Sequence, residues 1–151
     1  TTEIYTLSLH DALPILLALA GFYDPPFRIK AEESVDVVVD DGEEILRGRI
    51  DVLVLQDRFW VMVLESKKTT LSVWTAVPQA LAYLMANPNP NLPVFGMVTN
   101  GDDILFIKVA QADTPHYNLS RVFAPLTSAK ELYTVLQILK RFGQVAASIK
   151  S

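Results

Sequence analysis

Cysteine is absent from this 151-residue chain, and so are long apolar runs and any excess of basic residues. Without cysteine the protein can form neither disulfides nor thiolate metal sites, which suits a reducing, cytoplasmic compartment. No apolar run reaches the ~18 residues that a membrane helix requires, so we expect no membrane segment. The net charge of −4 excludes a nucleic-acid clamp that works through bulk positive charge.

Two sequence signals are also missing. The phosphate-binding pattern G-x-x-x-x-G-K-[ST] does not occur, so we expect no ATP site in this chain. The apolar segment from Leu13 to Gly21 has no basic region before it, which argues against a signal peptide. What the chain does contain is hydrophobic residues, which make up 50% of it. They are enough for the core of one domain of ordinary size.

The first residues of the chain look unlike the rest. The sequence from Tyr5 to Ile15, YTLSLHDALPI, resembles the translation of a common sequencing-library adapter. We therefore expect residues 1–15 to be an artefactual or displaced N-terminus and residues 16–151 to form the domain. His10 and Asp11 are left out of the functional argument for this reason. The alternative is an ordinary helix start in which Ser8 is the cap.

Two apolar segments joined by a short polar turn form the centre of the sequence. Ile50 to Leu55 and Phe59 to Leu64 are predicted to be the strands of a hairpin, because Gln56 to Arg58 between them are turn-compatible. Arg28 to Asp40 is rich in valine and predicts a strand before them. Three antiparallel strands are therefore expected in succession, after a helix that ends at Gly21.

The pattern changes after Lys68. Apolar residues from Val73 to Leu84 recur at helical spacing, which predicts a helix with Trp74 in the core and Pro78 at its start. The remaining predicted elements are a strand buried on both faces (Val94 to Thr99), a turn at Asn100-Gly101, a strand (Ile104 to Val109), a polar loop (Ala110 to Arg121) and a helix beginning at Ser128. This order predicts an α/β fold of three layers, with a mixed central β-sheet flanked by helices.

Two carboxylates and an ammonium group stand at the outer ends of the central hairpin. Side chains alternate along a strand, so Glu65 and Lys67 share a face, and folding about the turn near Asp57 and Arg58 is expected to bring Asp51 roughly opposite Glu65. Mg²⁺, or Mn²⁺ in its place, prefers oxygen ligands, and Ser66 is placed to add its backbone carbonyl. These residues predict a metal site for phosphodiester hydrolysis. Lys67 would position the attacking water or neutralise charge on the phosphate.

A simpler interpretation of each residue stands beside this one. The pattern E-x-K is common by chance, and Glu65 and Lys67 alone would fit a polar strand end. Asp51 favours the metal site because it interrupts an apolar strand, where an unpaired carboxylate is costly to bury. Gln79 and Tyr83 are four residues apart and share a helix face, which alone would fit the polar edge of an amphipathic helix.

The segment from Arg28 to Val109 resembles the PD-(D/E)XK nucleases, and more narrowly the N-terminal nuclease domain of type I restriction enzyme R subunits. Gly48 to Asp51 matches the first acid of that family, and Glu65 to Lys67 matches its E-x-K. Gln79 to Tyr83 matches the Q-x-x-x-Y motif of RecB-like nucleases, and Phe95 to Gly101 resembles the strand and turn that follow. The resemblance covers a little over half of the chain and implies a restriction-endonuclease-like fold.

The resemblance implies a role for each matching residue. Asp51 and Glu65 would be metal ligands and Lys67 the catalytic lysine. Gln79 and Tyr83 would orient the site or contact a DNA phosphate. The partners implied are DNA, a helicase or translocase domain, and methylation and specificity subunits.

The chain departs from the family pattern in two places. Ile50 stands where the family usually has a proline before the first acid. The opening helix of the family usually carries a glutamate near the metal, and that helix falls in the suspect first segment. Glu3 is a weak candidate for this glutamate.

Two main functions remain open. The first is a Mg²⁺-dependent DNA endonuclease domain. The second is a catalytically inactive nuclease-fold module that binds nucleic acid or a partner protein, and the fold alone does not separate the two. The joint presence of Asp51, Glu65 and Lys67 favours cleavage. A third, weaker alternative is a structural domain in which Glu65 and Lys67 pair with each other.

Overall fold

The structure is a computed structural model that describes the backbone of residues 9–30, 35–38, 45–48, 50–55, 59–64, 72–85, 93–100, 102–111 and 113–148. Side chains are described over residues 13–28, 72–82, 84–85, 93–100, 102–111 and 113–145. Helices and strands are both present, so the predicted α/β class is confirmed. In chain order the elements are α1 (Leu9–Leu19), β1 (Ile29–Lys30), β2 (Val35–Val38), β3 (Ile45–Gly48), β4 (Ile50–Leu55), β5 (Phe59–Leu64), η2 (Val73–Ala76), α2 (Val77–Met85), β6 (Val94–Thr99), β7 (Ile104–Ala110), β8 (His116–Leu119) and α3 (Ala129–Ser148).

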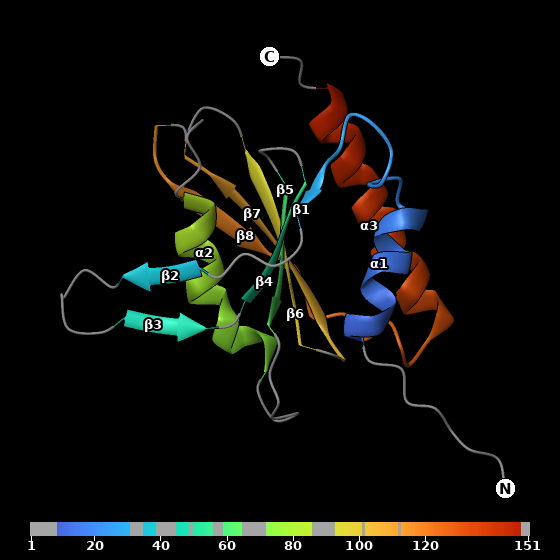
Figure 1. Cartoon of the computed structure of the whole chain (residues 1–151), viewed down its shortest axis with the longest axis horizontal. Coiled ribbons are helices and arrows are strands. Elements are labelled where there is room, and N and C mark those ends of the chain that lie inside the picture. The colour runs from blue at the N-terminus through green and yellow to red at the C-terminus, as the bar shows by residue number, and fades with distance from the viewer. Residues whose placement is uncertain are drawn as a thin grey trace, which may run out of the picture.

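A six-stranded mixed sheet runs through the centre of the molecule, in the order β1-β4-β5-β6-β7-β8 (Figure 1). β5 and β6 are parallel, and the other neighbouring pairs are antiparallel. Parallel neighbours need a crossover connection, and α2 lies in the connection between β5 and β6. β2 and β3 form a separate antiparallel hairpin, which contacts α2 and extends away from the large sheet (Figure 1).

Helices cover both faces of the large sheet. α1 and α3 lie side by side against one face, and α2 lies against the other (Figure 1). β6 is buried along its whole length. Phe95 and Met97 of this strand pack with α1 and α3, whereas Val94 and Val98 pack with α2. This division follows the two-residue period of a strand, so a continuous apolar run supplies both cores.

The two cores differ in composition, and we name them accordingly. The aromatic face is built on the following buried residues: Leu13, Leu16, Leu17, Phe22, Phe95, Met97, Ile104, Phe106, Phe123, Val135 and Leu139, with Phe27 and Phe142 packed against them. The aliphatic face contains no aromatic side chain among its described members: Val73, Ala76, Val77, Ala80, Leu84, Val94, Val98, Leu105, Ile107 and Val109.

Local sequence signals set the ends of the helices. Gly21 follows α1 with a φ of 91°, a left-handed conformation that glycine adopts without strain. Ser72 Oγ accepts a hydrogen bond from the backbone N–H of Trp74 at 3.2 Å and caps η2. Pro78 lies in the first turn of α2, where its missing N–H costs no helical hydrogen bond, as the sequence predicts. None of the helices in the described part of the chain is both long and apolar enough to cross a membrane.

The predicted strands Ile50 to Leu55, Phe59 to Leu64, Val94 to Thr99 and Ile104 to Val109 are confirmed, the last with one residue added. The predicted strand from Arg28 to Asp40 is wrong as a single element, because it contains β1 and β2, which belong to different sheets. The first part of this segment, β1, pairs antiparallel with β4, and β4 pairs antiparallel with β5, so three antiparallel strands do lie in succession, whereas β2 pairs with β3 in the separate hairpin. A local pattern can mark a strand, but the choice of its neighbour depends on which faces the whole chain buries.

Two further predictions are wrong. The segment from Ala110 to Arg121, expected to be a loop, contains β8, an edge strand that pairs only with β7 among the described strands. Most of its side chains are exposed, so it lacks the apolar alternation by which a strand is recognised. Trp74, expected in the core, is 49% exposed because η2 turns its neighbours Val73 and Ala76 inward instead.

α1 begins within the residues that the sequence marked as artefactual. Residues 9–15 belong to this helix, and Leu13 packs in the aromatic face beside Leu16 and Leu17. Residues 1–8, which include Glu3 and Ser8, lie outside the described residues.

Candidate metal centre

Asp51 belongs to a row of residues that crosses four adjacent strands. It is the second residue of β4, and its backbone is in register with Val63 of β5. Val63 is in register with Thr99 of β6, and Thr99 with Ile104 of β7. Residues in register occupy the same face of a sheet, and Ile104 is buried in the aromatic face. The row therefore lies on that face, at the end of the sheet where β6 finishes.

The register of the central hairpin differs by two residues from the expected one. Asp51 stands opposite Val63, whereas it was expected roughly opposite Glu65, two residues further along the chain. Leu55 pairs with Phe59, so the register is centred on residue 57, the middle of the predicted turn, and a pairing of Asp51 with Glu65 would need a centre at residue 58. A shift of two residues preserves the alternation of faces, whereas a shift of one would have reversed it.

Three predicted site residues lie outside the described part of the chain: Glu65, Ser66 and Lys67. Their convergence with Asp51 therefore stays a prediction. For Asp51 itself the structure describes the backbone position and its register.

Thr99 is the only buried polar side chain in the described part of the chain, with 0% of its surface exposed. Its hydroxyl Oγ1 has no hydrogen-bond partner there. A buried hydroxyl without a partner is less favourable than an apolar group of the same shape, so such a group needs a physical reason. Threonine is common in strands, so the sequence alone did not single out Thr99. The feature that distinguishes Thr99 in the sequence is a hydroxyl at the end of an otherwise apolar strand.

The turn after Thr99 is held by Asn100. Its Oδ1 accepts hydrogen bonds from the backbone N–H groups of Asp102 and Asp103, at 3.1 and 2.9 Å. Asparagine favours turns because its side chain can bond the backbone in this way. Thr99 pairs with Ile104, so the loop holds the four residues 100–103 rather than the expected two-residue turn. The contacts of Asn100 fix the course of the chain directly after the row.

Two carboxylates stand in this loop, at the same end of the sheet as the row. Burial raises the pKa of the Asp103 carboxyl above its ordinary value of 3.8, and the neighbouring Asp102 charge raises it further. Both effects disfavour the ionised form. The end of the sheet is therefore acidic in character, which is an environment that attracts a cation.

α2 runs back along β6 on the aliphatic face. The carbonyl of Met85, its last residue, accepts a hydrogen bond of 2.6 Å from Gln111 Nε2, just beyond the end of β7. Leu84 lies against Gly96, where a Cβ would come within 2.9 Å of the leucine Cδ1. The C-terminal end of α2 therefore lies near the start of β6, and its first turn lies toward the end where β6 finishes.

The predicted pair Gln79 and Tyr83 both belong to α2. Gln79 is half-buried and lies in the part of the helix nearer the row, whereas Tyr83 lies one turn further away. The side chain of Tyr83 is outside the described set. α2 covers the aliphatic face and the row occupies the aromatic face, so Gln79 can approach the row only around the end of the sheet.

Among the side chains that the structure describes, no three His, Cys, Asp or Glu residues gather in a group that could hold a metal ion. The side chains of Asp51 and Glu65 do not belong to this set. What the described residues provide is the row itself, with an acid at one position and a buried, unpaired hydroxyl two strands away.

No protein-family model matches the chain, and no match was found among curated proteins or solved structures.

Proposed function

We propose that this chain is a Mg²⁺-dependent DNA endonuclease domain with a restriction-endonuclease-like fold, as in the R subunit of a type I restriction-modification system. The observation that supports this most is the row through Asp51 and Thr99, because an acid and a buried unpaired hydroxyl share one register at the end of the sheet. The antiparallel hairpin of β4 and β5, followed by a crossover helix and the parallel strand β6, is consistent with the same fold.

The residues fit a hard divalent cation. Asp51 and Glu65 would offer carboxylate oxygens and Ser66 its backbone carbonyl, and such oxygen ligands suit Mg²⁺ or Mn²⁺. When bound, the ion would polarise the scissile phosphate and lower the pKa of a bound water.

The other residues act on the DNA. Lys67 would hold its ammonium group beside the phosphate and neutralise the charge that develops on its oxygens. Gln79, at the end of α2 nearer the row, would orient the site or donate to a phosphate oxygen, and Tyr83 would support it from the next turn.

Metal-dependent cleavage of supercoiled plasmid DNA tests the proposal. We expect the wild-type chain to nick the plasmid with Mg²⁺ or Mn²⁺ and to stop when EDTA is added. Asp51→Asn should abolish cleavage because a carboxylate ligand is lost, and Lys67→Ala should lower the cleavage rate by roughly 10²- to 10³-fold. Circular dichroism would confirm that both variants remain folded.

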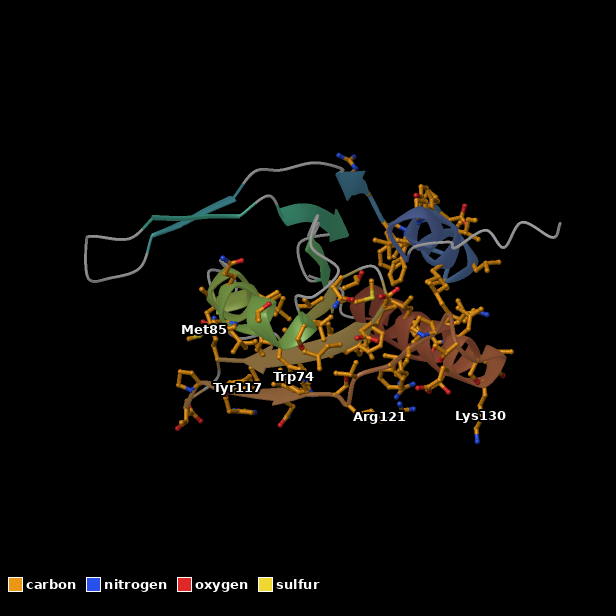
Figure 2. All side chains as sticks on the ribbon, turned by 90° about the horizontal axis from the view of Figure 1, so that it is seen from below. Trp74, Met85, Tyr117, Arg121 and Lys130 are labelled. Atoms are coloured by element: carbon orange, nitrogen blue, oxygen red, sulfur yellow. The ribbon has the colours of Figure 1, made fainter. Side chains whose placement is uncertain are left out.

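Two surface variants serve as matched controls. Asp113→Asn and Lys130→Ala remove the same charges from exposed positions, Asp113 on a loop and Lys130 on α3. Lys130 is labelled in Figure 2. Both should cleave at the wild-type rate. Cleavage that persists without a divalent metal, or a folded Asp51→Asn variant with wild-type activity, would contradict the proposal.

One observation weighs against cleavage by the chain alone and keeps the inactive binding module as the second candidate. The net charge of −4 disfavours DNA binding by the chain alone. In an active endonuclease, a helicase or translocase domain, with methylation and specificity subunits, would bring the DNA to the site. Binding of DNA or of such a partner without any metal-dependent cleavage would favour the inactive module instead.

A further inference from the structure

The strand β8 forms one edge of the six-stranded sheet. It pairs with β7 on one side, and none of the described strands lies on its other side. An edge strand presents backbone N–H and C=O groups to which another strand can pair, and lysines, acidic residues or prolines within the strand commonly prevent this. The sequence of β8, HYNL, contains none of these residues. The outer edge of β8 is therefore a candidate surface for strand pairing.

The hydrogen bonds to β7 show which backbone groups of β8 point outward. The N–H of Ser120 donates to the carbonyl of Phe106 at 2.9 Å, and these two residues continue the register of β8 and β7. In an antiparallel ladder, residues that bond the neighbouring strand alternate with residues that point away from it. The N–H and C=O groups of Tyr117 and Leu119 therefore point toward the outer edge.

The side chains of the same two residues continue the aliphatic face to this edge. Tyr117, labelled in Figure 2, is in register with Val109, and Leu119 is in register with Ile107. Val109 and Ile107 are buried in that core, and Leu119 packs against it. Tyr117 nevertheless remains 55% exposed, because it lies on the last strand of the sheet. A further strand beside β8 would cover part of its ring.

The charges on either side of β8 favour a second copy of the chain as that strand. Asp113 and Arg121 are equally far from Tyr117 in the sequence, and both are exposed. If two copies pair antiparallel with their Tyr117 residues opposite each other, Asp113 of each copy comes to face Arg121 of the other. Opposite charges across a strand pair stabilise it. Arg121 already bonds Glu131, but its side chain remains 60% exposed and can accept a second carboxylate.

We propose that β8 pairs antiparallel with β8 of a second copy, about a two-fold axis at Tyr117, and so joins two sheets in a homodimer. Tyr117 exchanges both of its backbone hydrogen bonds with its counterpart, and the N–H of Leu119 donates to the carbonyl of Pro115 in the other copy. Pro115 has no N–H and ends the ladder there. The contact is isologous, as a two-fold axis requires.

The dimer goes beyond the proposed nuclease function and does not depend on it. β5, β6 and β7 lie between β8 and β4, the strand that carries Asp51, so the contact is remote from the candidate metal centre. A contact built on one short strand is small, and small interfaces are weak and reversible. We therefore expect dimers to form at chain concentrations of roughly 10 μM to 1 mM.

Sedimentation of the full chain across this concentration range is the first test. The wild-type chain should convert from monomer to dimer as its concentration rises. Tyr117→Lys places like charges directly opposite each other and should weaken dimerisation by about tenfold or more. Tyr133→Lys is the matched control, because Tyr133 is a 64% exposed tyrosine on α3, and it should dimerise as the wild type does. Thermal unfolding of dilute samples would check that each variant is folded.

A cross-link tests the register and does not depend on the lysine variant. The chain has no cysteine, so Tyr117→Cys introduces a single thiol that faces its counterpart. Residues opposite each other at such a position have Cα atoms about 5.5 Å apart, which a disulfide can bridge. In Asn118→Cys the two Cα atoms would be about 8 Å apart, which is too far. Mild oxidation should therefore link Tyr117→Cys into dimers and leave Asn118→Cys largely unlinked.

Three results would overturn the proposal. The first is a wild-type chain that stays monomeric up to the highest concentration, including one whose β8 pairs only with a different protein. The second is a dimer that Tyr117→Lys does not weaken, because another surface would then hold it together. The third is a Tyr117→Cys variant that forms no more disulfide dimer than Asn118→Cys.

Discussion

The two faces of the large sheet are built from different side chains and from different parts of the chain. On the aromatic face, Phe142 of α3 stacks on Phe95 with ring centroids 4.5 Å apart and meets Phe106 edge-on at 5.4 Å. The aliphatic face has only small and branched side chains among its described members, and α2 comes close enough for Leu84 to touch the backbone at Gly96. On the aromatic face, large rings fill the space between segments that are distant in the sequence. On the aliphatic face, the side chains are small and the helix lies close to the sheet.

The difference teaches where a polar site can be placed in this fold. The aliphatic face forms from η2, α2, β6 and β7, which follow one another in the chain, and its cluster contains no polar residue. The aromatic face joins α1, α3 and the sheet, and the buried hydroxyl of Thr99 lies at its rim, in register with Asp51. The polar row thus lies where segments distant in sequence meet.

Deleting a buried leucine on each face should produce the largest effects and would test the comparison directly. Leu139 and Leu84 are 0% and 1% exposed, and Leu139→Ala and Leu84→Ala should each cost about 2–5 kcal/mol in the free energy of unfolding. We expect the larger cost at Leu139, because the rings and the 20-residue helix around it cannot easily collapse into the cavity. The nine-residue α2 can shift toward the sheet when Leu84 is shortened. Urea unfolding measures both costs, and an equal or larger loss at Leu84 would contradict the comparison.

Adding a methyl group to a glycine on each face is a second test of the comparison between the two faces. Gly96→Ala should destabilise the protein by about 1–3 kcal/mol, because its Cβ would lie 2.9 Å from Leu84 Cδ1. In a Leu84→Ala background the same change should cost less, since the clashing atoms are gone. Gly143→Ala is the matched change on the aromatic face, where a Cβ would lie 3.3 Å from Phe22 Cε1. There the gain in helix propensity of about 1 kcal/mol should offset the contact and leave stability nearly unchanged. Thermal unfolding of the four variants tests this, and equal losses at both glycines would contradict it.

The smallest effect is expected at the surface edge of the aromatic face. Arg121, labelled in Figure 2, lies near α3. It lies over the ring of Phe123 at 4.0 Å and donates two hydrogen bonds to Glu131 of α3, at 2.9 and 2.8 Å. The hydrogen bond from Arg121 is the main reason that the pKa of Glu131 lies below its ordinary value of 4.5. A lowered pKa in the folded state contributes stability above the unfolded value, and this contribution is lost as the pH falls through the folded value.

Arg121→Gln should therefore lower the unfolding midpoint slightly at neutral pH, and the difference from wild type should shrink as the pH falls below 4.5. Thermal scans of both proteins between neutral and acidic pH measure this difference. Arg121→Lys is the control for charge, because it keeps the positive charge but loses the paired hydrogen bonds. A difference that stays constant with pH would mean that Arg121 acts through its contact with Phe123 alone.

The sequence by itself determined the elements whose signals are local. The polar turn between two apolar runs specified the β4–β5 hairpin, Pro78 marked the first turn of α2, and the unbroken apolar run ending at Thr99 specified a strand buried on both faces. The helical spacing of apolar residues likewise specified α3, whose Val135 and Leu139 are fully buried. These features depend on residues within one or two turns of each other, so a single sequence contains the information. The same holds for Asp51 as a candidate acid, because one polar residue in an apolar strand is visible without a fold.

Only the tertiary structure decided which residues stand beside one another. It divided the predicted strand from Arg28 to Asp40 between two sheets, paired the polar segment β8 with β7, and turned Trp74 outward. It also brought Thr99 into the row of Asp51, although 47 residues separate them in the chain. The physical reason is that register and strand neighbours are fixed by the burial of whole faces. That free energy is summed over segments far apart in the sequence, and no local pattern contains it.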